Sequence, residues 1–261
     1  MSLLNRIPLS ERIKEIARIK KEVNTEQNGT VVYITISGSD LYGFSSADSD
    51  VDYRGTYATG THNLLGLRSP RDLIDMQPDV VMFELRKELL LALASNCNVV
   101  EHINSKPIYN HPEFFEMRRL VNNCLNKKGL YGSYNGLATH NYEKFISKGV
   151  KTYKKYLYIF RSLMAATYVF ETGQIQPNMD ELNKRYKLPE VRDALKAKRA
   201  GAEMDDVQED IDSGSWDELV IKLMEKVNVA YEKSKMPTEP EEDDVAALNK
   251  WLLDFRRSIQ K

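Results

Sequence analysis

The sequence predicts an α+β fold, in which a small mixed β-sheet with flanking helices is followed by an all-helical C-terminal region. Three segments rich in β-branched and aromatic residues are expected to be strands, at 31–37, 50–58 and 79–84. After these segments the chain changes character and continues as a succession of helix-like segments. We therefore expect a core over residues 1–110 and a helical domain over residues 111–261.

The first helix is expected before the sheet. Ile13, Ile16, Ile19 and Val23 recur at spacings of three, three and four residues, so they form one stripe along a helix. Ser10 precedes that stripe and is the expected N-cap. The turn signal EQNGT then separates the helix from the first strand, VVYITIS, and a second apolar helix, LRKELLLALAS, is expected directly after the third strand.

The later helices are marked by their ends. Gly173 is the expected C-cap of the helical stretch 141–173, and Ser215, with Glu218 three residues on, has the spacing of a capping box. A proline-containing acidic linker near 236–244 precedes a terminal amphipathic helix. One side of that helix carries Leu248, Trp251, Leu252 and Phe255.

Charge and cysteine content limit the classes of partner. The formal net charge is −1, but eight Lys/Arg and one acid lie between 127 and 161, and fifteen acids and four lysines between 201 and 244. Cys97 and Cys124 form no C-x-x-C motif, so buried thiols are favoured over a zinc site or a disulfide. No apolar run approaches the roughly 18 to 20 residues of a spanning helix, and we expect a soluble, cytoplasmic protein with no membrane partner.

The stretch SGSDLYGFSSADSDVD, residues 37–52, carries the candidate chemistry. Gly38 follows the first strand, where a glycine lets the backbone turn sharply and approach a ligand closely. Ser39 adds a hydroxyl, and backbone N–H groups at this turn can form a nest for a phosphate. After a spacer of ten residues, Asp50 and Asp52 stand at i and i+2, which on a strand places both carboxylates on one face about 7 Å apart.

Two carboxylates so close repel each other unless a cation lies between them. Mg²⁺, or Mn²⁺ in its place, takes oxygen ligands and leaves positions for phosphate oxygens. Two such ions can activate an attacking hydroxyl and hold a triphosphate leaving group. The motif therefore predicts a metal-dependent site at Asp50 and Asp52, whereas an isolated D-x-D is also typical of a solvated turn.

The order of these features, with a strand, G-S, a spacer and then D-x-D, resembles the DNA polymerase β-like nucleotidyltransferase superfamily. The resemblance implies a palm-like nucleotidyltransferase core, a nucleoside triphosphate such as ATP as substrate, and a third carboxylate on a neighbouring strand. Asp79 and Glu84 compete for that third position. We favour Asp79, because Glu84 is also explained as an acid at the N-terminus of a helix.

A longer stretch, GSDLYGFSSADSDVDYRGTY, is similar to the G-S-x-x-[YH]-G-x-x-x-x-x-S-D-x-D-x-R-G motif of the RlaP-type nucleotidyltransferases, a branch associated with RNA repair. The similarity continues in VVMFELRKELLLALASNCNVVEHI and YKKYLYIFRSLMAATYVFETGQI. Cys97 stands where the family usually has proline, and Tyr158 where it has histidine, which leaves the role of position 158 open. On this resemblance Gly38 and Ser39 bind the triphosphate, and Asp50, Asp52 and Asp79 hold the metal ions.

The resemblance covers about residues 31–200 and implies transfer of a nucleoside monophosphate to an acceptor hydroxyl with release of pyrophosphate. RNA, and a damaged or processed tRNA end in particular, is the acceptor it favours. The alternatives are a protein or small-molecule acceptor, and a non-catalytic module that binds nucleotide or RNA.

Cationic side chains complete the expected nucleotide site. Arg54 follows the D-x-D and is either a phosphate ligand or an ion-pair partner that neutralises the acids. Lys151 and Lys155 belong to a stretch rich in lysine and tyrosine, which either binds phosphates or forms a solvated face over packed tyrosines. Arg161 lies in an otherwise apolar helix and needs a partner there. The four histidines share no metal-ligand spacing.

Overall fold

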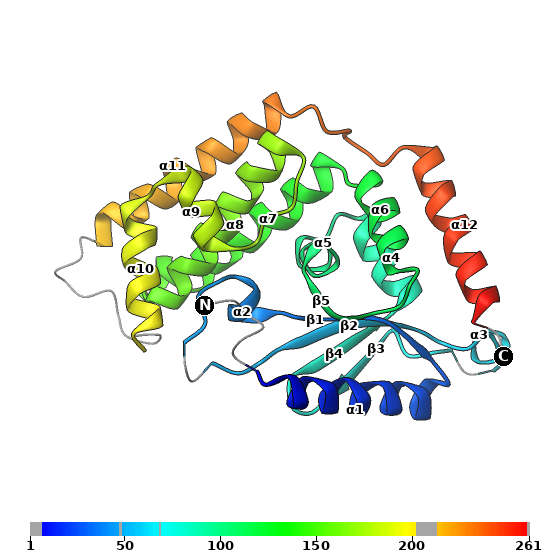
Figure 1. Cartoon of the computed structure of the whole chain (residues 1–261). Coiled ribbons are helices and arrows are strands. Elements are labelled where there is room, and N and C mark those ends of the chain that lie inside the picture. Colours follow the sequence, from blue (N-terminus) through cyan, green and yellow to red (C-terminus); the bar gives the residue numbers. More distant parts are fainter. Residues whose placement is uncertain (1–6, 47–48, 68, 202–212, 260–261) are drawn as a thin grey trace. The chain divides into compact units, whose positions relative to one another are not determined.

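The computed structural model describes residues 7–46, 49–67, 69–201 and 213–259. Within these residues it confirms the α+β class, since one five-stranded mixed sheet lies among helices (Figure 1). The chain forms two compact units. The first consists of Met1–Gly38, Asp50–Leu125 and Pro240–Lys261, and the second of Ser39–Ser49 and Asn126–Glu239.

The sheet belongs to the first unit and has the strand order β3-β4-β2-β1-β5. β2 and β4 pair in parallel, and the other neighbouring strands pair antiparallel. The strands are β1 (Thr30–Ile36), β2 (Tyr53–Ala58), β3 (Leu73–Met76), β4 (Val80–Glu84) and β5 (Pro107–Asn110).

Two expected strands are confirmed as β1 and β4, whereas the prediction for 50–58 is wrong at its start. The chain turns away after β1 at Gly38, so β2 finds its regular partner only from Tyr53 onward. Asp50 and Asp52 therefore precede the strand instead of lying on it. β3 and β5 are absent from the sequence prediction, because strands of four residues are too short for an alternating pattern to stand out.

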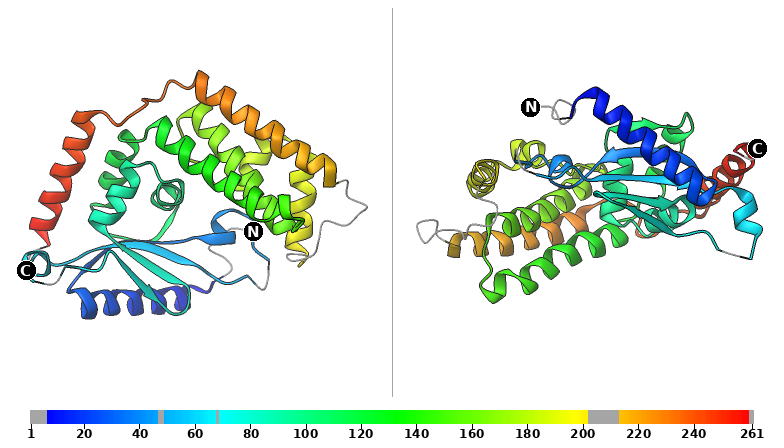
Figure 2. Two further views of the ribbon diagram at one scale, coloured as in Figure 1. Left: turned by 180° about the vertical axis from the view of Figure 1, so that it is seen from behind. Right: turned by 90° about the horizontal axis from the view of Figure 1, so that it is seen from below.

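Helices cover both faces of the sheet (Figure 2). α1 lies along one face, where its buried Ile19 and Val23 pack with strand residues such as Ile34. The core on the other face joins Tyr33 of β1 to residues of α4, α5, α6 and α12. The helices of this unit are α1 (Leu9–Gln27), α3 (Thr61–Leu65), α4 (Leu85–Leu93), α5 (Cys97–Asn104), α6 (Phe114–Asn123) and α12 (Glu242–Ser258), and α2 (Gly38–Leu41) follows β1.

The predicted start of α1 is wrong. The helix begins at Leu9, directly after Pro8, so Ser10 lies inside its first turn and is not the N-cap. A proline suits a helix start, because its missing N–H would have no partner there. Ile13 is 57% exposed whereas Ile19 and Val23 are fully buried. Ile16 is partly buried against the same core, so Ile13 is the member of the predicted stripe that does not pack on the sheet.

The second unit is helical, and α8 forms its core. α7, α10 and α11 pack against α8, most of whose side chains are buried. Trp216 of α11 lies against Tyr153, Tyr156 and Phe160 of α8, with ring centroids 5.1 to 5.9 Å apart. The elements are α7 (Lys127–Lys144), the 3-10 helix η2 (Ile146–Lys148), α8 (Tyr153–Thr172), α9 (Met179–Tyr186), α10 (Pro189–Arg199) and α11 (Ser213–Lys233).

The predicted helix ends have mixed outcomes. Gly173 is confirmed as the C-cap of α8, where it adopts the left-handed φ of +72°. The capping box at Ser215 is wrong, because α11 already begins at Ser213 and Ser215 lies inside it. The terminal amphipathic helix is confirmed as α12, whose Leu248, Trp251 and Phe255 are buried.

Cys97 and Cys124 are buried and form no disulfide, as expected. None of the helices in the described part of the chain combines the length and the apolar character that a bilayer crossing requires.

Candidate active site

The turn after β1 requires a glycine. Gly38 has a φ of +61°, in the left-handed region that residues with a side chain rarely adopt. A Cβ atom at this position would lie 2.1 Å from Oδ2 of Asp52. The G-S turn and the D-x-D segment are therefore in direct contact, and the missing side chain leaves the space that the Asp52 carboxylate occupies.

Ser37 connects this turn to two other segments. Its N–H donates to the carbonyl of Asp52 at 2.8 Å, and its Oγ is hydrogen-bonded to Nε2 of His102 at 2.8 Å. His102 lies on α5 and is 7% exposed. Sequence reasoning missed this contact, because the two partners are 65 residues apart and neither belongs to a recognisable motif.

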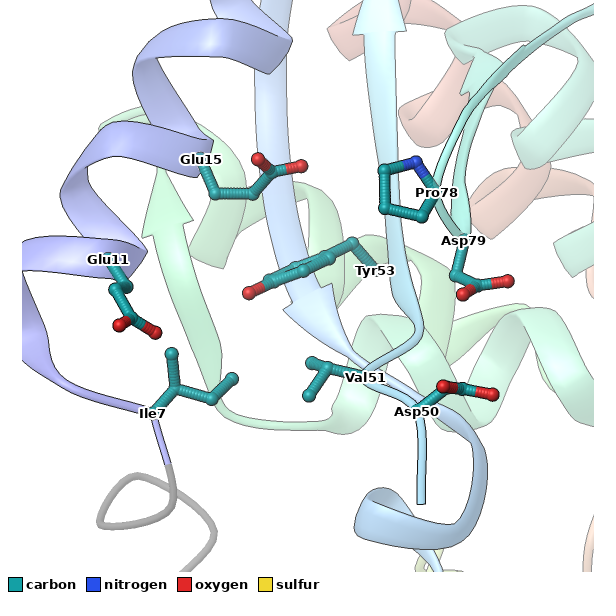
Figure 3. A pocket seen from close by; sticks show the side chains of 8 residues that line it. All are labelled: Ile7, Glu11, Glu15, Asp50, Val51, Tyr53, Pro78 and Asp79. Atoms are coloured by element: carbon teal, nitrogen blue, oxygen red, sulfur yellow. The ribbon is translucent and has the colours of Figure 1, made fainter. Parts of the chain in front are cut away.

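The pairing of β2 with β4 brings a third carboxylate to the D-x-D segment. The parallel register aligns Tyr53 with Val80, the first residues of β2 and β4. Asp52 and Asp79 therefore each directly precede the start of a strand, side by side. The N–H of Tyr53 donates to the carbonyl of Asp79 at 2.9 Å. Asp50 and Asp79 line the same pocket (Figure 3). The structure thus brings together three of the predicted acids.

Arg54 holds this corner of the sheet together. Its Nη2 forms an ion pair with Oδ1 of Asp52 at 3.2 Å. Its Nη1 donates to the carbonyls of Tyr53 and Asp79, at 2.9 and 3.1 Å. Arg54 therefore forms the ion pair that was one of its two interpretations, and its contact with a phosphate stays a prediction.

Glu84, the competitor of Asp79, lies at the other end of β4. Its carboxylate forms a buried ion pair with Arg256 of α12 at 2.8 Å. It also accepts a hydrogen bond at 2.7 Å from the N–H of Arg86 and thereby caps α4. Both observations give Glu84 a structural role away from the D-x-D segment.

The carboxylates at this corner have the donor chemistry of a magnesium site. Among the described residues, Asp50 and Asp79 have no ion-pair or side-chain hydrogen-bond partner, while Asp52 shares one oxygen with Arg54. No group of three or more His, Cys, Asp or Glu side chains in the same ranges is arranged to hold a metal by itself. Mg²⁺ commonly takes one or two carboxylates and completes its coordination with water and substrate phosphates. Metal binding by Asp50, Asp52 and Asp79 stays a prediction.

The remaining predicted ligands belong to the second unit. Arg161 of α8 is buried, and its guanidinium carbon lies 3.8 Å from the centre of the Tyr42 ring. Tyr158, the position that the resemblance left open, packs edge-on against Tyr42 with ring centroids 6.0 Å apart. The segment that begins at Ser39 therefore packs on the face of α8 that carries Arg161.

The two predicted lysines have different surroundings. Lys151 forms an ion pair with Asp217 of α11 at 2.6 Å. The Nζ of Lys155 lies 3.5 Å from the centre of the Phe145 ring. Burial, together with the charges of two neighbouring lysines, lowers the pKa of Lys155. Binding of a nucleotide by either lysine stays a prediction.

Comparison with known proteins identifies a family that matches most of the chain. Residues 10–254 match the RlaP family, "RNA repair pathway DNA polymerase beta family". The chain belongs to the RlaP family. The resemblance inferred from the sequence is confirmed, and RlaP membership indicates a polymerase β-like nucleotidyltransferase.

Two relatives of this chain are described as uncharacterized proteins. YcgL of Bacillus subtilis (strain 168) is 27% identical over 266 residues, which cover 95% of this chain and 96% of that protein. MJ0002 of Methanocaldococcus jannaschii is 29% identical over 153 residues, which cover 56% of this chain and 62% of that protein.

One buried acid was missed by sequence reasoning. Glu88 of α4 is 1% exposed and accepts hydrogen bonds from the hydroxyl of Tyr33, at 2.6 Å, and from that of Thr56. Burial raises the pKa of Glu88 from 4.5 to about 7, although both hydrogen bonds oppose the shift. An acid within the apolar run LRKELLLALAS was the available signal.

Proposed function

We propose that this protein transfers a nucleoside monophosphate from a nucleoside triphosphate to a hydroxyl group of an RNA, such as a tRNA end, and releases pyrophosphate. The acceptor oxygen forms a bond to the α-phosphorus, and the bond from that phosphorus to the bridging oxygen breaks. The hydroxyl proton passes to solvent. Such a transfer asks little covalent chemistry of the protein, so positioning and charge stabilisation supply most of the catalysis.

The observation that carries the proposal is the contact between Gly38 and Asp52. A glycine turn that holds phosphates and a carboxylate that binds a metal must lie within one ligand's length of each other. Here a Cβ on Gly38 would lie 2.1 Å from the Asp52 carboxylate. The solvent-facing Asp50 and Asp79 flank Asp52 and have no competing partner among the described residues. Family membership supports the same chemistry independently.

Asp50 and Asp52, assisted by Asp79, would hold Mg²⁺ or Mn²⁺ together with the phosphate oxygens. A divalent ion bound there would neutralise the triphosphate and lower the pKa of the attacking hydroxyl. The protein's own part is to fix the carboxylates. Arg54 orients Asp52 through one oxygen and leaves the other facing Gly38.

The turn at Gly38 and Ser39 would hold the β- and γ-phosphates through its backbone N–H groups and the serine hydroxyl. Of the cations in the second unit, Arg161 is the best supported nucleotide ligand, because it packs on the segment that follows Ser39. Lys155 has no anionic partner among the described residues, whereas Lys151 would have to leave Asp217 to reach a phosphate.

RNA as the acceptor is supported by two observations. The matching family carries RNA repair in its description. The stretch 127–161 has eight Lys/Arg against one acid, which favours a phosphate backbone.

The test is a labelling assay with the full chain. Each α-labelled NTP is incubated with the protein and Mg²⁺ or Mn²⁺, separately with total RNA, tRNA and a protein extract. The double variant Asp50→Asn/Asp52→Asn removes the proposed metal ligands without changing their shape. Asp75→Asn is the matched control, because Asp75 is an exposed acid on β3 of the same sheet.

We expect label in the RNA or tRNA pool, unchanged by Asp75→Asn and reduced by at least about 100-fold in the double variant. Label in the protein pool would replace RNA by a protein acceptor. A folded protein that labels no pool, and whose NTP binding does not depend on Mg²⁺ or on Asp50, would refute the transferase and favour a non-catalytic binding module.

A further inference from the structure

The proposed metal site opens into a pocket of about 500 Å³ on the α1 side of the sheet (Figure 3). This volume is within the range of roughly 300 to 1,000 Å³ that is common for small-ligand sites. Helix α1 forms one wall, and the segments before β2 and β4 form the other. The lining residues are Ile7, Glu11, Glu15, Asp50, Val51, Tyr53, Pro78 and Asp79.

Tyr53 projects into this pocket from β2, with its hydroxyl directed toward the α1 wall (Figure 3). Its side chain is only 8% exposed, yet its hydroxyl has no hydrogen-bond partner among the described residues. Burial, and the neighbouring charges of Glu15 and Glu11, raise the pKa of Tyr53. The ring of Tyr53 is thus buried, while its hydroxyl opens to the pocket and is available to bond a ligand.

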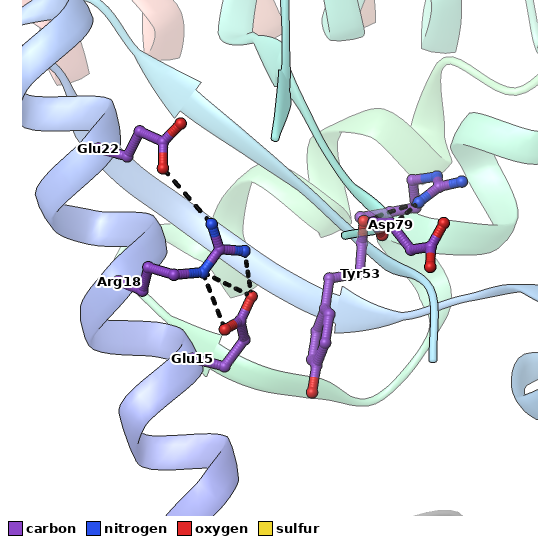
Figure 4. A network of polar contacts seen from close by, with 6 residues as sticks. Glu15, Arg18, Glu22, Tyr53 and Asp79 are labelled. Atoms are coloured by element: carbon purple, nitrogen blue, oxygen red, sulfur yellow. Dashed lines mark hydrogen bonds and ion pairs between the residues drawn. The ribbon is translucent and has the colours of Figure 1, made fainter. Parts of the chain in front are cut away.

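The charge of the pocket is negative. Arg18 neutralises Glu15 through hydrogen bonds of 3.0 and 3.1 Å and also reaches Glu22 (Figure 4). Glu11 has no such partner among the described residues. Were divalent ions bound on the Asp50 side, Glu11 would be the lining carboxylate left without an ion-pair partner among the described residues. It accepts hydrogen bonds and repels anions.

The negative charge of Glu11 thus disfavours the phosphates of a nucleoside triphosphate on the α1 side of the pocket, which leaves that side to the acceptor. A group that donates O–H or N–H hydrogen bonds suits Glu11 and the Tyr53 hydroxyl, and the apolar Ile7, Val51 and Pro78 suit a flat ring. A ribonucleoside combines these properties. A terminal phosphate is instead an anion, which the Glu11 carboxylate repels.

We propose that this pocket receives the terminal nucleoside of the acceptor RNA with both ribose hydroxyls unphosphorylated, and that it discriminates against an end that carries a 3′-phosphate. The inference rests on the proposed transfer reaction and names the class of RNA end that enters it. A 3′-phosphorylated end still offers a 2′-hydroxyl for attack. The discrimination therefore comes from the charge of the pocket and not from the absence of a nucleophile.

The first measurement is a binding experiment that needs no turnover. The four ribonucleosides and their 3′-monophosphates are titrated calorimetrically into the full chain in the presence of Mg²⁺. We expect at least one nucleoside to bind about 10-fold or more tightly than its 3′-monophosphate. Glu11→Gln should reduce the ratio of the two affinities, because it removes the negative charge. Tyr53→Phe should weaken nucleoside binding several-fold with little loss of stability, because the hydroxyl has no hydrogen-bond partner among the described residues. Glu22→Gln is the control, with the same charge change on α1 outside the pocket.

The second measurement compares label transfer to one RNA with a 3′-hydroxyl and to the same RNA with a 3′-phosphate. We expect the hydroxyl end to be preferred by the wild type, and Glu11→Gln to raise the relative use of the phosphate end. Transfer to both ends with equal efficiency, or equal binding of nucleoside and 3′-monophosphate, would overturn the pocket assignment alone. No transfer to either end, with the nucleoside preference intact, would overturn the proposed reaction and still support the selectivity of the pocket.

Discussion

Replacing Gly38 with alanine tests whether the glycine turn and the D-x-D segment form one site. The new methyl group would lie 2.1 Å from Oδ2 of Asp52, so this oxygen has to retreat by about 1.3 Å to reach an ordinary contact of 3.4 Å. The Asp52 carboxylate is the far end of a short side chain and can rotate, but rotation strains its 3.2 Å ion pair with Arg54.

The effect of this substitution on the free energy of unfolding can be separated from its effect on the transfer rate. Alanine in the left-handed conformation costs about 1–2 kcal/mol, which a domain with a typical stability of about 5–15 kcal/mol tolerates. A displacement of about 1 Å at a reacting centre lowers a rate by about 100-fold. We therefore expect Gly38→Ala to fold, to lose about 1–2 kcal/mol of unfolding free energy, and to lose about 100-fold in the initial rate of label transfer.

Gly173→Ala is the matched control for this variant. Gly173 has a φ of +72° and would place its Cβ in open space, so alanine there carries the backbone cost without the clash. Both variants are compared by urea denaturation, by initial transfer rate and by Mg²⁺-dependent affinity for NTP. Transfer rates and NTP affinities of Gly38→Ala that match those of Gly173→Ala would refute the reasoning, because Asp52 would then not act at the site.

Three further changes address groups whose surroundings only the structure shows. Because the pKa of Glu88 is raised from 4.5 to about 7, its favourable contribution is complete below pH 4.5 and is lost as the pH rises through 7. Glu88→Gln should remove up to about 3 kcal/mol of that pH-dependent loss of stability. If the free energies of unfolding of wild type and variant changed equally between pH 4.5 and 8, this prediction would be contradicted. His102→Ala should lower the rate of label transfer by a larger factor than its loss of unfolding free energy accounts for. Ser37 then loses the partner that holds it beside the turn. An unchanged rate in a destabilised variant would show that the contact is purely structural. Lys151→Met should destabilise the protein by about 1 kcal/mol, because it leaves the partly buried Asp217 without its ion-pair partner. Weaker NTP binding with unchanged stability would instead support a direct contact of Lys151 with phosphate.

Much of the candidate site was predictable, because its central elements are close in sequence. The strand–glycine–serine order and the D-x-D lie within 22 residues, from Val31 to Asp52, and each feature has a local cause in backbone conformation or charge. The same locality explains the confirmed C-cap at Gly173, where only the end of one helix is involved. The start of β2 was predicted too early, because a strand begins where its partner is available and not where β-prone residues begin.

The sequence by itself determined the α+β class, the family and the order of glycine turn and acidic pair, since these depend on the residue types of short segments. Only the tertiary structure decided which distant groups join them. Asp79 stands beside Asp52 because β2 and β4 pair in parallel, while the same pairing carries Glu84 to the opposite end and to Arg256. Strand register and helix packing are set by the whole core. No local pattern therefore encodes the contact of Ser37 with His102, or the burial of Glu88 beneath Tyr33.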